Sequence, residues 1–405
     1  MATQKNPLLN LLLLAFALGI CFAGLEFFFR TTHWLGARAS WARPDALIGW
    51  GLAPGRGYFY PHENPSGIYF DVNRFGYRDR EWTEEKPDGT FRVAVLGDSY
   101  VEALQVDHGK TFLALAEKKL SQAAGRKIEF MNFGRSCFTQ SEELLVLTRD
   151  ILKFKPDLVI VFYYAINDIG DLAPPTALSL MRPFYEELPD GSLKLDTSFN
   201  KTRAFKMKTW LNPFKKRSTL ISLITERFII FERVKQAEQT GLLGSDPDAH
   251  ESLRAYLSLA TSTPEPQYVK NYRLSKRLLS EMARTSQAHQ ARFMLVNIDL
   301  PSYLPEVAQK FKSVNPTFDP DFFDQDLAVF AAKEDMLFLG LEEPFRQKAQ
   351  ALGRPLHFKY WDAIGIKGYW EYGAHTGHWN EDGHALVADQ LVEKILPLLA
   401  PEAAA

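Results

Sequence analysis

The chain has 405 residues, enough for one large domain with insertions or for two ordinary domains. Hydrophobic residues make up 46% and charged residues 24%, an ordinary globular mixture that argues against wholesale disorder. The net charge of −2 gives the chain as a whole no electrostatic reason to bind nucleic acid. Its two cysteines, Cys21 and Cys137, are too few for a disulfide framework or a cysteine-based zinc site.

The N-terminal segment is strongly apolar. Residues 7–29 match the length of roughly 20 residues that a helix needs to cross the hydrocarbon core of a bilayer. A cleavable signal peptide would have a shorter apolar stretch and a better cleavage site than Cys21-Phe22-Ala23. We therefore predict an uncleaved transmembrane anchor, with the Glu26 carboxylate close enough to one end to reach the interface.

The charges around this segment do not fix its orientation. Lys5 precedes the apolar run, whereas Arg30, Arg38 and Arg43 follow it. The positive-inside rule alone would keep the following domain in the cytoplasm, but long C-terminal domains translocate largely regardless of such charges.

Residues 30–90 have no sustained helical or strand period, which predicts a loop-rich lead-in that packs on the main domain. A regular alternation begins at residue 91 and predicts a parallel sheet with right-handed crossovers. Thr139 and Glu142 have the spacing of a helix capping box. The predicted strands are Phe91–Leu96, Lys127–Phe133 and Asp157–Tyr164, and the predicted helices are Lys110–Leu120 and Thr139–Phe154.

The alternation is interrupted by an insertion over residues 170–265. A hairpin is predicted around Pro189-Asp190-Gly191, and Leu220–Gln236 has amphipathic helical spacing. Residues 201–217 are strongly basic, and two interpretations stay open for them: a solvated loop and helix face, or a patch that rests on anionic lipid or glycan. The cations are Lys201, Arg203, Lys206, Lys208, Lys215, Lys216 and Arg217.

After the insertion the α/β pattern resumes. The complete pattern over residues 91–400 predicts a three-layer α/β/α domain around a parallel sheet of about five strands. The remaining predicted elements are a helix at Tyr268–His289, strands at Arg292–Asp299 and Met336–Leu341, and a last helix at Gly383–Leu396.

Polar residues follow three of the predicted strands. Gly97-Asp98-Ser99-Tyr100 comes directly after the first strand, Asn132–Cys137 follows the second, and Ala165-Ile166-Asn167-Asp168 follows the third. Because the carboxyl ends of parallel strands line one crevice, these groups should meet there. Taken alone, Gly-Asp-Ser is ordinary turn chemistry.

Three histidines, His375, His378 and His384, cluster just before the last helix. A serine nucleophile needs a base to accept its proton, and histidine is the usual one. A histidine metal site is an alternative for this cluster, but no other ligand run in the sequence completes it.

In this order, the strand followed by Gly-Asp-Ser, the two Asn-containing blocks and the C-terminal His-Trp-Asn resemble the SGNH (GDSL-like) hydrolases. The resemblance covers about residues 91–400, with the insertion discounted. The stretches DVNRFGYRDR (71–80) and GDSYVEALQV (97–106) are similar to membrane-tethered bacterial members linked with envelope polysaccharide. The resemblance implies a flavodoxin-like fold and an extracytoplasmic domain, periplasmic in a Gram-negative cell.

Residue by residue, the resemblance implies that Ser99 is the nucleophile and that His378 is its base. Asn167 matches the side-chain amide of the oxyanion hole, to which the Ser99 N–H also contributes. The second backbone donor matches Cys137, with Gly134 as the alternative, although the family has glycine at this position. His384 then has a capping or packing role in the last helix.

The triad acid departs from the family pattern. It is expected two or three residues before the histidine, where this chain has Thr376 and His375. Three interpretations stay open: another carboxylate orients His378, a backbone carbonyl does so, or the site has lost activity. The nearest carboxylates are Glu371, Glu381 and Asp382.

The sequence thus predicts a membrane-anchored serine esterase or acyl-transfer enzyme that needs no cofactor or metal. By resemblance its substrate is an O-acyl group, removed from or transferred to an envelope polysaccharide. A non-catalytic module that binds glycan or supports its assembly is the alternative, and hydrolysis of lipid or small esters is a third hypothesis.

Overall fold

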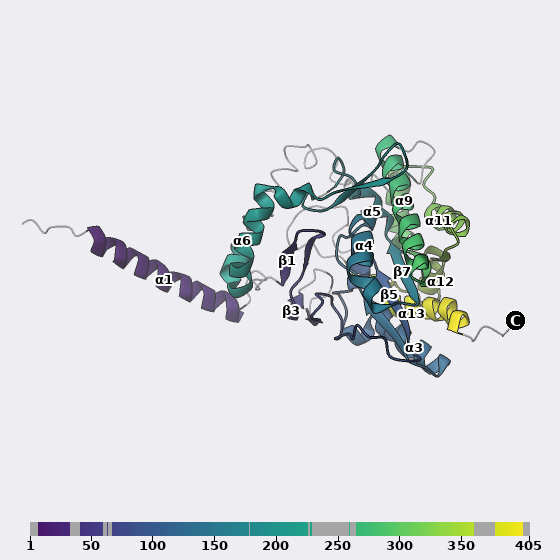
Figure 1. Cartoon of the computed structure of the whole chain (residues 1–405), viewed down its shortest axis with the longest axis horizontal. Helices are drawn as coiled ribbons and strands as arrows, with labels where there is room; N and C mark the ends of the chain where they lie inside the picture. Colours follow the sequence, from purple (N-terminus) through teal and green to yellow (C-terminus); the bar gives the residue numbers. More distant parts are fainter. Residues whose placement is uncertain are drawn as a thin grey trace, which may run out of the picture.

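The computed structural model describes residues 7–32, 41–59, 63, 67–177, 179–225, 227–228, 259, 265–359 and 377–399. Helix α1 (Pro7–Thr32) projects away from an α/β body (Figure 1). By length and composition it can cross a membrane, and Phe29 is its buried residue. The N-terminal apolar helix expected from the sequence is therefore present as a candidate membrane span.

The body is built on a five-stranded parallel sheet in the order β11-β10-β7-β5-β6. The first strand of the sheet in the chain lies between the second and the third, which is the flavodoxin-like order. The predicted fold class is thus confirmed. The strands are β5 (Phe91–Leu96), β6 (Ile128–Asn132), β7 (Leu158–Tyr163), β10 (Arg292–Asn297) and β11 (Leu337–Gly340).

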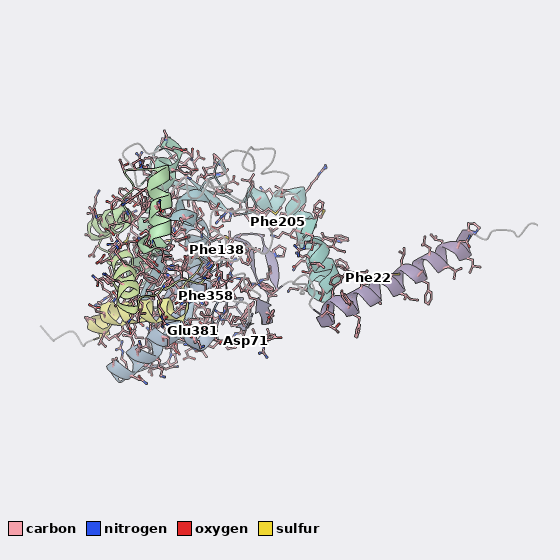
Figure 2. All side chains as sticks on the ribbon, turned by 180° about the vertical axis from the view of Figure 1, so that it is seen from behind. Phe22, Asp71, Phe138, Phe205, Phe358 and Glu381 are labelled. Carbon is pink, nitrogen blue, oxygen red and sulfur yellow. The ribbon has the colours of Figure 1, made fainter. Side chains whose placement is uncertain are left out.

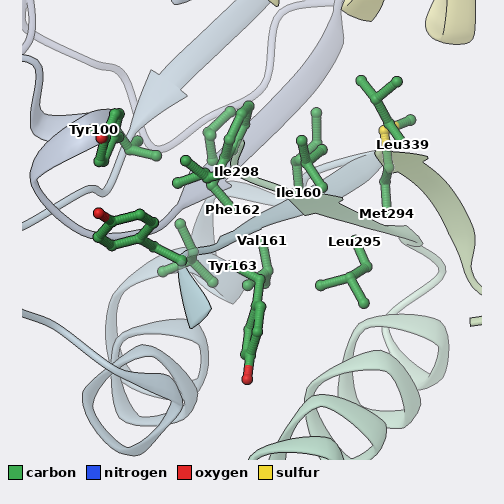
Figure 3. Packing of buried hydrophobic residues seen from close by; sticks show 14 of the residues in the cluster. Tyr100, Ile160, Val161, Phe162, Tyr163, Met294, Leu295, Ile298 and Leu339 are labelled. Atoms are coloured by element: carbon green, nitrogen blue, oxygen red, sulfur yellow. The ribbon is translucent and has the colours of Figure 1, made fainter. Parts of the chain in front are cut away.

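Helices cover both faces of this sheet. Every residue of β5 and β7 is buried, as expected for strands covered on two sides. Successive strand residues point to opposite faces. The Phe162 ring centroid lies 4.8 Å from that of Phe112 on α3 (Phe112–Ala124). The Tyr163 hydroxyl, on the other face, accepts a hydrogen bond from Ser275 on α9 (Pro266–Ala288). Figure 3 shows this alternation in the core, with Ile160 and Met294 on one side and Tyr163 and Leu295 on the other.

The remaining helices complete the two outer layers. α13 packs on α3, while α4 and α5 pack on α9. The capping box predicted at Thr139 and Glu142 is present at the start of α4. After α4 the chain continues as a π-helical segment (Leu147–Ile151) and a 3-10 turn (Leu152–Phe154). The bounds are α4 (Gln140–Val146), α5 (Ala165–Gly170), α10 (Pro305–Val314), α11 (Phe322–Lys333), α12 (Glu342–Leu352) and α13 (Glu381–Ile395).

The lead-in contains short strands where the sequence predicted mainly loops. β1 (Ala42–Asp45) pairs with β2 (Gly49–Leu52), and β3 (Gly55–Phe59) pairs with β4 (Ile68–Val72), both antiparallel. After β4, the buried Arg78 donates to the carbonyls of Glu102 (2.8 Å) and Val106 (2.5 Å). The lead-in is thereby tied to the loop that follows the first strand of the sheet.

The insertion carries the predicted hairpin and a basic helix. β8 (Phe184–Glu187) and β9 (Leu193–Asp196) pair antiparallel around the Pro189–Gly191 turn. α6 (Arg203–Arg217) follows, and residues 219–225 begin another helix. Most of the amphipathic segment Leu220–Gln236 lies outside the described residues.

Candidate active site

Ser99 lies at the carboxyl end of β5, on the first turn of α2 (Ser99–Glu102). Gly97 makes the turn with φ +154°, and a Cβ there would collide with Val101 Cγ2, so the position needs glycine. The buried Asp98 caps α2 by accepting a hydrogen bond from the Tyr100 N–H at 2.9 Å. The strand, the turn and the cap together place the Ser99 side chain at the edge of the sheet where the crevice is expected.

His378 is held by a short backbone ladder and a buried tryptophan. The Phe358 N–H donates to the His378 carbonyl at 2.8 Å, and the Gly377 N–H donates to the Phe358 carbonyl at 3.0 Å. The next residue, Trp379, is fully buried, and its Nε1–H donates to Asp299 at 2.8 Å. The histidine therefore has a hydrogen-bonded neighbour on each side, which restricts where its ring can point.

The Ser99 and His378 side chains meet, and a third side chain completes the chain of hydrogen bonds. His378 Nε2 lies 2.7 Å from Ser99 Oγ, and His378 Nδ1 lies 2.9 Å from both Glu63 carboxylate oxygens. Glu63 is only 7% exposed. A Cβ on Gly377 would lie 3.0 Å from Glu63 Cδ, so this glycine allows the close approach. A serine, a histidine and a carboxylate are thus aligned in the geometry of a serine triad.

The carboxylate beside His378 is not one of the three that the sequence suggested. Glu381 accepts a hydrogen bond from Lys110 at 2.7 Å on the surface, and Asp382 pairs with Arg354 at 2.7 Å. Both lie in the first turn of α13 and are engaged by cations there. Glu371 lies outside the described residues. The carboxylate that contacts His378 is that of Glu63, which comes from the lead-in, 315 positions away from His378.

The environment of His378 favours its protonated form. Burial alone would lower the pKa of the imidazole, but the charge and the hydrogen bond of Glu63 raise that pKa above its ordinary value of 6.5. Burial raises the pKa of Asp98 to about 6 against the hydrogen bond from Tyr100. The His378 side chain keeps 24% of its surface exposed, so a substrate can reach it.

Asn167 lies close to Ser99 because it follows β7, the strand next to β5. Its side-chain amide donates to Asp98 Oδ2 at 2.5 Å. An amide nitrogen has two hydrogens, and this bond orients the group while using one of them. The half-buried Asn167 can therefore donate its second hydrogen to an oxyanion.

The loop after β6 contains both backbone positions proposed for the oxyanion hole. Cys137 adopts φ +61°, the left-handed region that glycine favours. Its carbonyl accepts a hydrogen bond from the buried Arg182 at 2.7 Å. The Gly134 N–H donates to Asn132 Oδ1 at 2.9 Å, and a Cβ on Gly134 would lie 2.6 Å from the Glu102 nitrogen. Cys137 thus has the glycine-like backbone, whereas Gly134 is needed for packing.

Of the other two histidines of the C-terminal cluster, only His384 lies in the described part of the chain. His384 is buried on α13, where its Nδ1 accepts from the Phe112 N–H at 3.3 Å. Burial lowers its pKa to about 3, so the ring stays neutral and packs on Phe112. His375 lies outside the described residues. Within the described ranges, no group of three or more His, Cys, Asp or Glu side chains is arranged to hold a metal.

Among known proteins, similarity to this chain is found with solved structures. No protein-family model and no curated protein matches the chain. The lipase Lip_vut3 from a goat rumen metagenome is 11% identical with a TM-score of 0.39, over 76% of this chain and 100% of that one. Axe2, an acetylxylan esterase from Geobacillus stearothermophilus, is 12% identical with a TM-score of 0.35 (75% and 94%). TesA is 16% identical with a TM-score of 0.33 (76% and 99%). With TM-scores below 0.5, the functional assignment depends on the geometry of the site.

Proposed function

We propose that the chain is a serine esterase or acyl-transfer enzyme of the SGNH type. The observation that carries this proposal is the hydrogen-bonded series Ser99 Oγ–His378 Nε2 and His378 Nδ1–Glu63, with distances of 2.7 and 2.9 Å. A serine placed on a strand-to-helix turn, a histidine at hydrogen-bond distance and a buried carboxylate behind it are the parts that nucleophilic catalysis needs.

The reaction begins when Ser99 Oγ attacks the ester carbonyl carbon and His378 Nε2 takes the hydroxyl proton. Glu63 stabilises the imidazolium that forms and keeps the ring oriented. The Asn167 amide and the backbone N–H groups of Ser99 and Cys137 stabilise the negative oxygen of the tetrahedral intermediate. The bond to the alcohol oxygen then breaks, and His378 returns the proton to the departing alcohol. Water or a sugar hydroxyl, deprotonated by His378, then attacks the acyl carbonyl. The bond between that carbonyl and Ser99 Oγ breaks, and His378 returns the proton to Ser99 Oγ.

For the substrate we propose O-acyl groups on an envelope polysaccharide, reached by a domain that α1 anchors outside the cytoplasm. The sequence resemblance supports this choice, and so does a cavity of about 260 Å³ beside the Cys137 loop. Trp41, Trp50 and Phe59 form an aromatic wall of this cavity, and Glu102 and Ser136 line it as well. Aromatic walls with a few polar groups are typical of small-molecule sites and suit the flat face of a sugar ring.

The non-catalytic alternative depends on two departures from the family pattern, the missing acid and Cys137. Glu63 occupies the position behind His378 that a triad acid needs, and Cys137 has the backbone conformation of the glycine it replaces. These two observations favour catalysis over a binding module, so we propose an esterase.

The test is covalent labelling and turnover with the full chain in detergent micelles. The wild type should react with a fluorophosphonate probe and hydrolyse p-nitrophenyl acetate. Ser99→Ala and His378→Ala should lose both activities, because each removes one partner of the 2.7 Å contact. Ser192→Ala, in the surface turn between β8 and β9, is the matched serine control and should behave as the wild type. A folded wild type that neither reacts with the probe nor turns over the ester would contradict the proposal.

A further inference from the structure

The C-terminal end of α1 contacts the junction between α6 and the helix that begins at residue 219. The Glu26 carboxylate accepts hydrogen bonds from the Ser218 hydroxyl (2.7 Å) and from the N–H groups of Thr219 and Leu220 (both 2.9 Å). It thus caps the helix that begins at residue 219, where a negative charge is favoured. Arg30 donates to the Arg217 carbonyl at 2.6 Å, at the C-terminal end of α6. Polar contacts at the C-terminal end of α6 and at the start of the following helix therefore attach the insertion to α1.

An apolar contact strengthens the same junction. Phe29, the buried residue of α1, forms a cluster with Leu220 and Leu223. The contact lies at the end of α1 that leads into the body, so a membrane crossed by α1 would have its surface near this junction. α6 leaves the junction across the direction of α1, as both views show (Figures 1 and 2). The helix is thereby placed to run along such a surface.

α6 has two unlike faces. At 100° per residue, Met207, Trp210 and Phe214 form one stripe, and their side chains are 56%, 67% and 47% exposed. Phe205 projects from the opposite side, is buried and packs against Phe199 at 5.3 Å between ring centroids. α6 also contacts β1 of the lead-in, and its buried Phe205 side lies opposite the exposed apolar stripe.

Cations surround this stripe. Arg203 and Arg217 lie at its two ends, and Lys206 and Lys215 lie on its flanks. Beyond the junction, Ile224 and Phe228 add two more apolar side chains that are 59% and 58% exposed. Exposed tryptophan and phenylalanine between arginines and lysines is the composition of helices that lie in a membrane interface.

We propose that α6 is an interfacial helix that docks on the anionic lipid surface of the membrane crossed by α1. Met207, Trp210 and Phe214 enter the boundary between headgroups and acyl chains, and the cations bind lipid phosphates. An acidic glycan would account for the cations but would leave the apolar stripe in water. The inference rests on the proposed anchoring by α1 and extends it. Two attachments, one across the bilayer and one along it, hold the catalytic body in a fixed orientation above the membrane.

The test is site-specific labelling of the full chain in nanodiscs of phosphatidylcholine and phosphatidylglycerol. Cys21 and Cys137 are replaced by alanine, and a single cysteine is introduced by Trp210→Cys or by Lys216→Cys, then labelled with an environment-sensitive fluorophore. Lys216 is the matched control because it is exposed on the opposite side of α6. The label at position 210 should show blue-shifted emission and lose quenching by aqueous iodide, while the label at 216 should stay quenched. Adding Arg203→Glu, Lys206→Glu and Lys215→Glu should restore iodide quenching at position 210.

The outcomes separate the two parts of the proposal. Failure of the chain to enter nanodiscs would overturn the anchoring by α1. Entry with equal iodide quenching at positions 210 and 216 would overturn the interfacial helix alone, and this result would also follow if the basic face bound an acidic glycan. Neither result depends on esterase activity, so the proposed function is tested separately.

Discussion

Cys137 shows how a single residue departs from the sequence pattern while its backbone keeps the required conformation. Its φ of +61° places it in the left-handed region, which costs an L-residue of this kind on the order of 1 kcal/mol relative to glycine. The surrounding structure maintains this conformation, in part through the hydrogen bond from Arg182 to the Cys137 carbonyl. In the proposed oxyanion hole the donor at this position is the backbone N–H, which cysteine supplies as glycine does.

Cys137→Gly should therefore stabilise the protein without loss of turnover. The relief of strain exceeds the entropy that glycine adds to the unfolded chain, so the free energy of unfolding should rise by up to about 1 kcal/mol. Denaturant unfolding monitored by circular dichroism measures the change. Cys137→Ala is the matched control, because it removes the thiol, keeps the strain and should give no gain. Equal stability of the glycine and alanine variants would show that strain at this residue is absent.

The elements of the sheet could be predicted from sequence because their physical signals are local. Buried parallel strands such as Leu158–Tyr163 are continuous apolar runs, and Thr139 with Glu142 marks the start of a helix by spacing alone. The hairpins of the lead-in gave no such signal. Their strands have only four or five residues, and two of them, Gly49–Leu52 and Gly55–Phe59, contain glycines, so too few side chains alternate to establish a period.

The segment that carries His378 depends on the burial of one side chain, Trp379. Its Nε1–H donates to the fully buried Asp299, and its ring stacks on Phe345 with centroids 5.5 Å apart. Trp379 also lies 4.8 Å from the ring of Tyr100, the residue after the nucleophile. The tryptophan therefore joins the histidine segment to the turn that holds the serine.

Trp379→Phe should lower both stability and turnover. It leaves an oxygen of the buried Asp299 without its donor, a loss worth about 1–3 kcal/mol of unfolding free energy. The loosened His378 should reduce kcat more than it changes KM, because the histidine acts in the chemical step. Thermal unfolding and steady-state kinetics measure the two effects. The same substitution at the exposed Trp210 is the control, and it should leave stability and turnover unchanged in detergent. If Trp379→Phe and Trp210→Phe had the same stability and the same turnover, the anchoring role of Trp379 would be contradicted.

At the scale of the whole molecule, the site assembles side chains that are far apart in the chain. Ser99 and His378 are separated by 279 positions, and Glu63 and His378 by 315. The serine, Asn167 and the histidine could be proposed from sequence because each follows a recognisable element or motif. Nothing local marks Glu63, which lies in the lead-in and reaches His378 only through the tertiary fold. A search confined to carboxylates near the histidine could not find it.

The lead-in is therefore part of the proposed catalytic body and not only a connection to the membrane. Arg78 donates to the carbonyls of Glu102, at the end of α2, and of Val106, in the loop after it, and Asp79 accepts a hydrogen bond from the Asn132 N–H at the end of β6. These contacts hold the lead-in against the two strands whose ends carry Ser99 and the Cys137 loop. Glu63 belongs to this same lead-in, and its carboxylate contacts His378.

The pH dependence of kcat/KM for p-nitrophenyl acetate in Glu63→Gln tests the central claim most directly. The wild type should lose activity as the pH falls through the His378 pKa, which Glu63 holds above 6.5, because only the neutral imidazole accepts the serine proton. In Glu63→Gln the lost negative charge should move this limb to lower pH, and turnover should fall by on the order of 10⁴. Glu381→Gln, which removes a surface carboxylate engaged by Lys110, should reproduce the wild-type profile. A Glu63→Gln profile indistinguishable from that of Glu381→Gln would contradict the account.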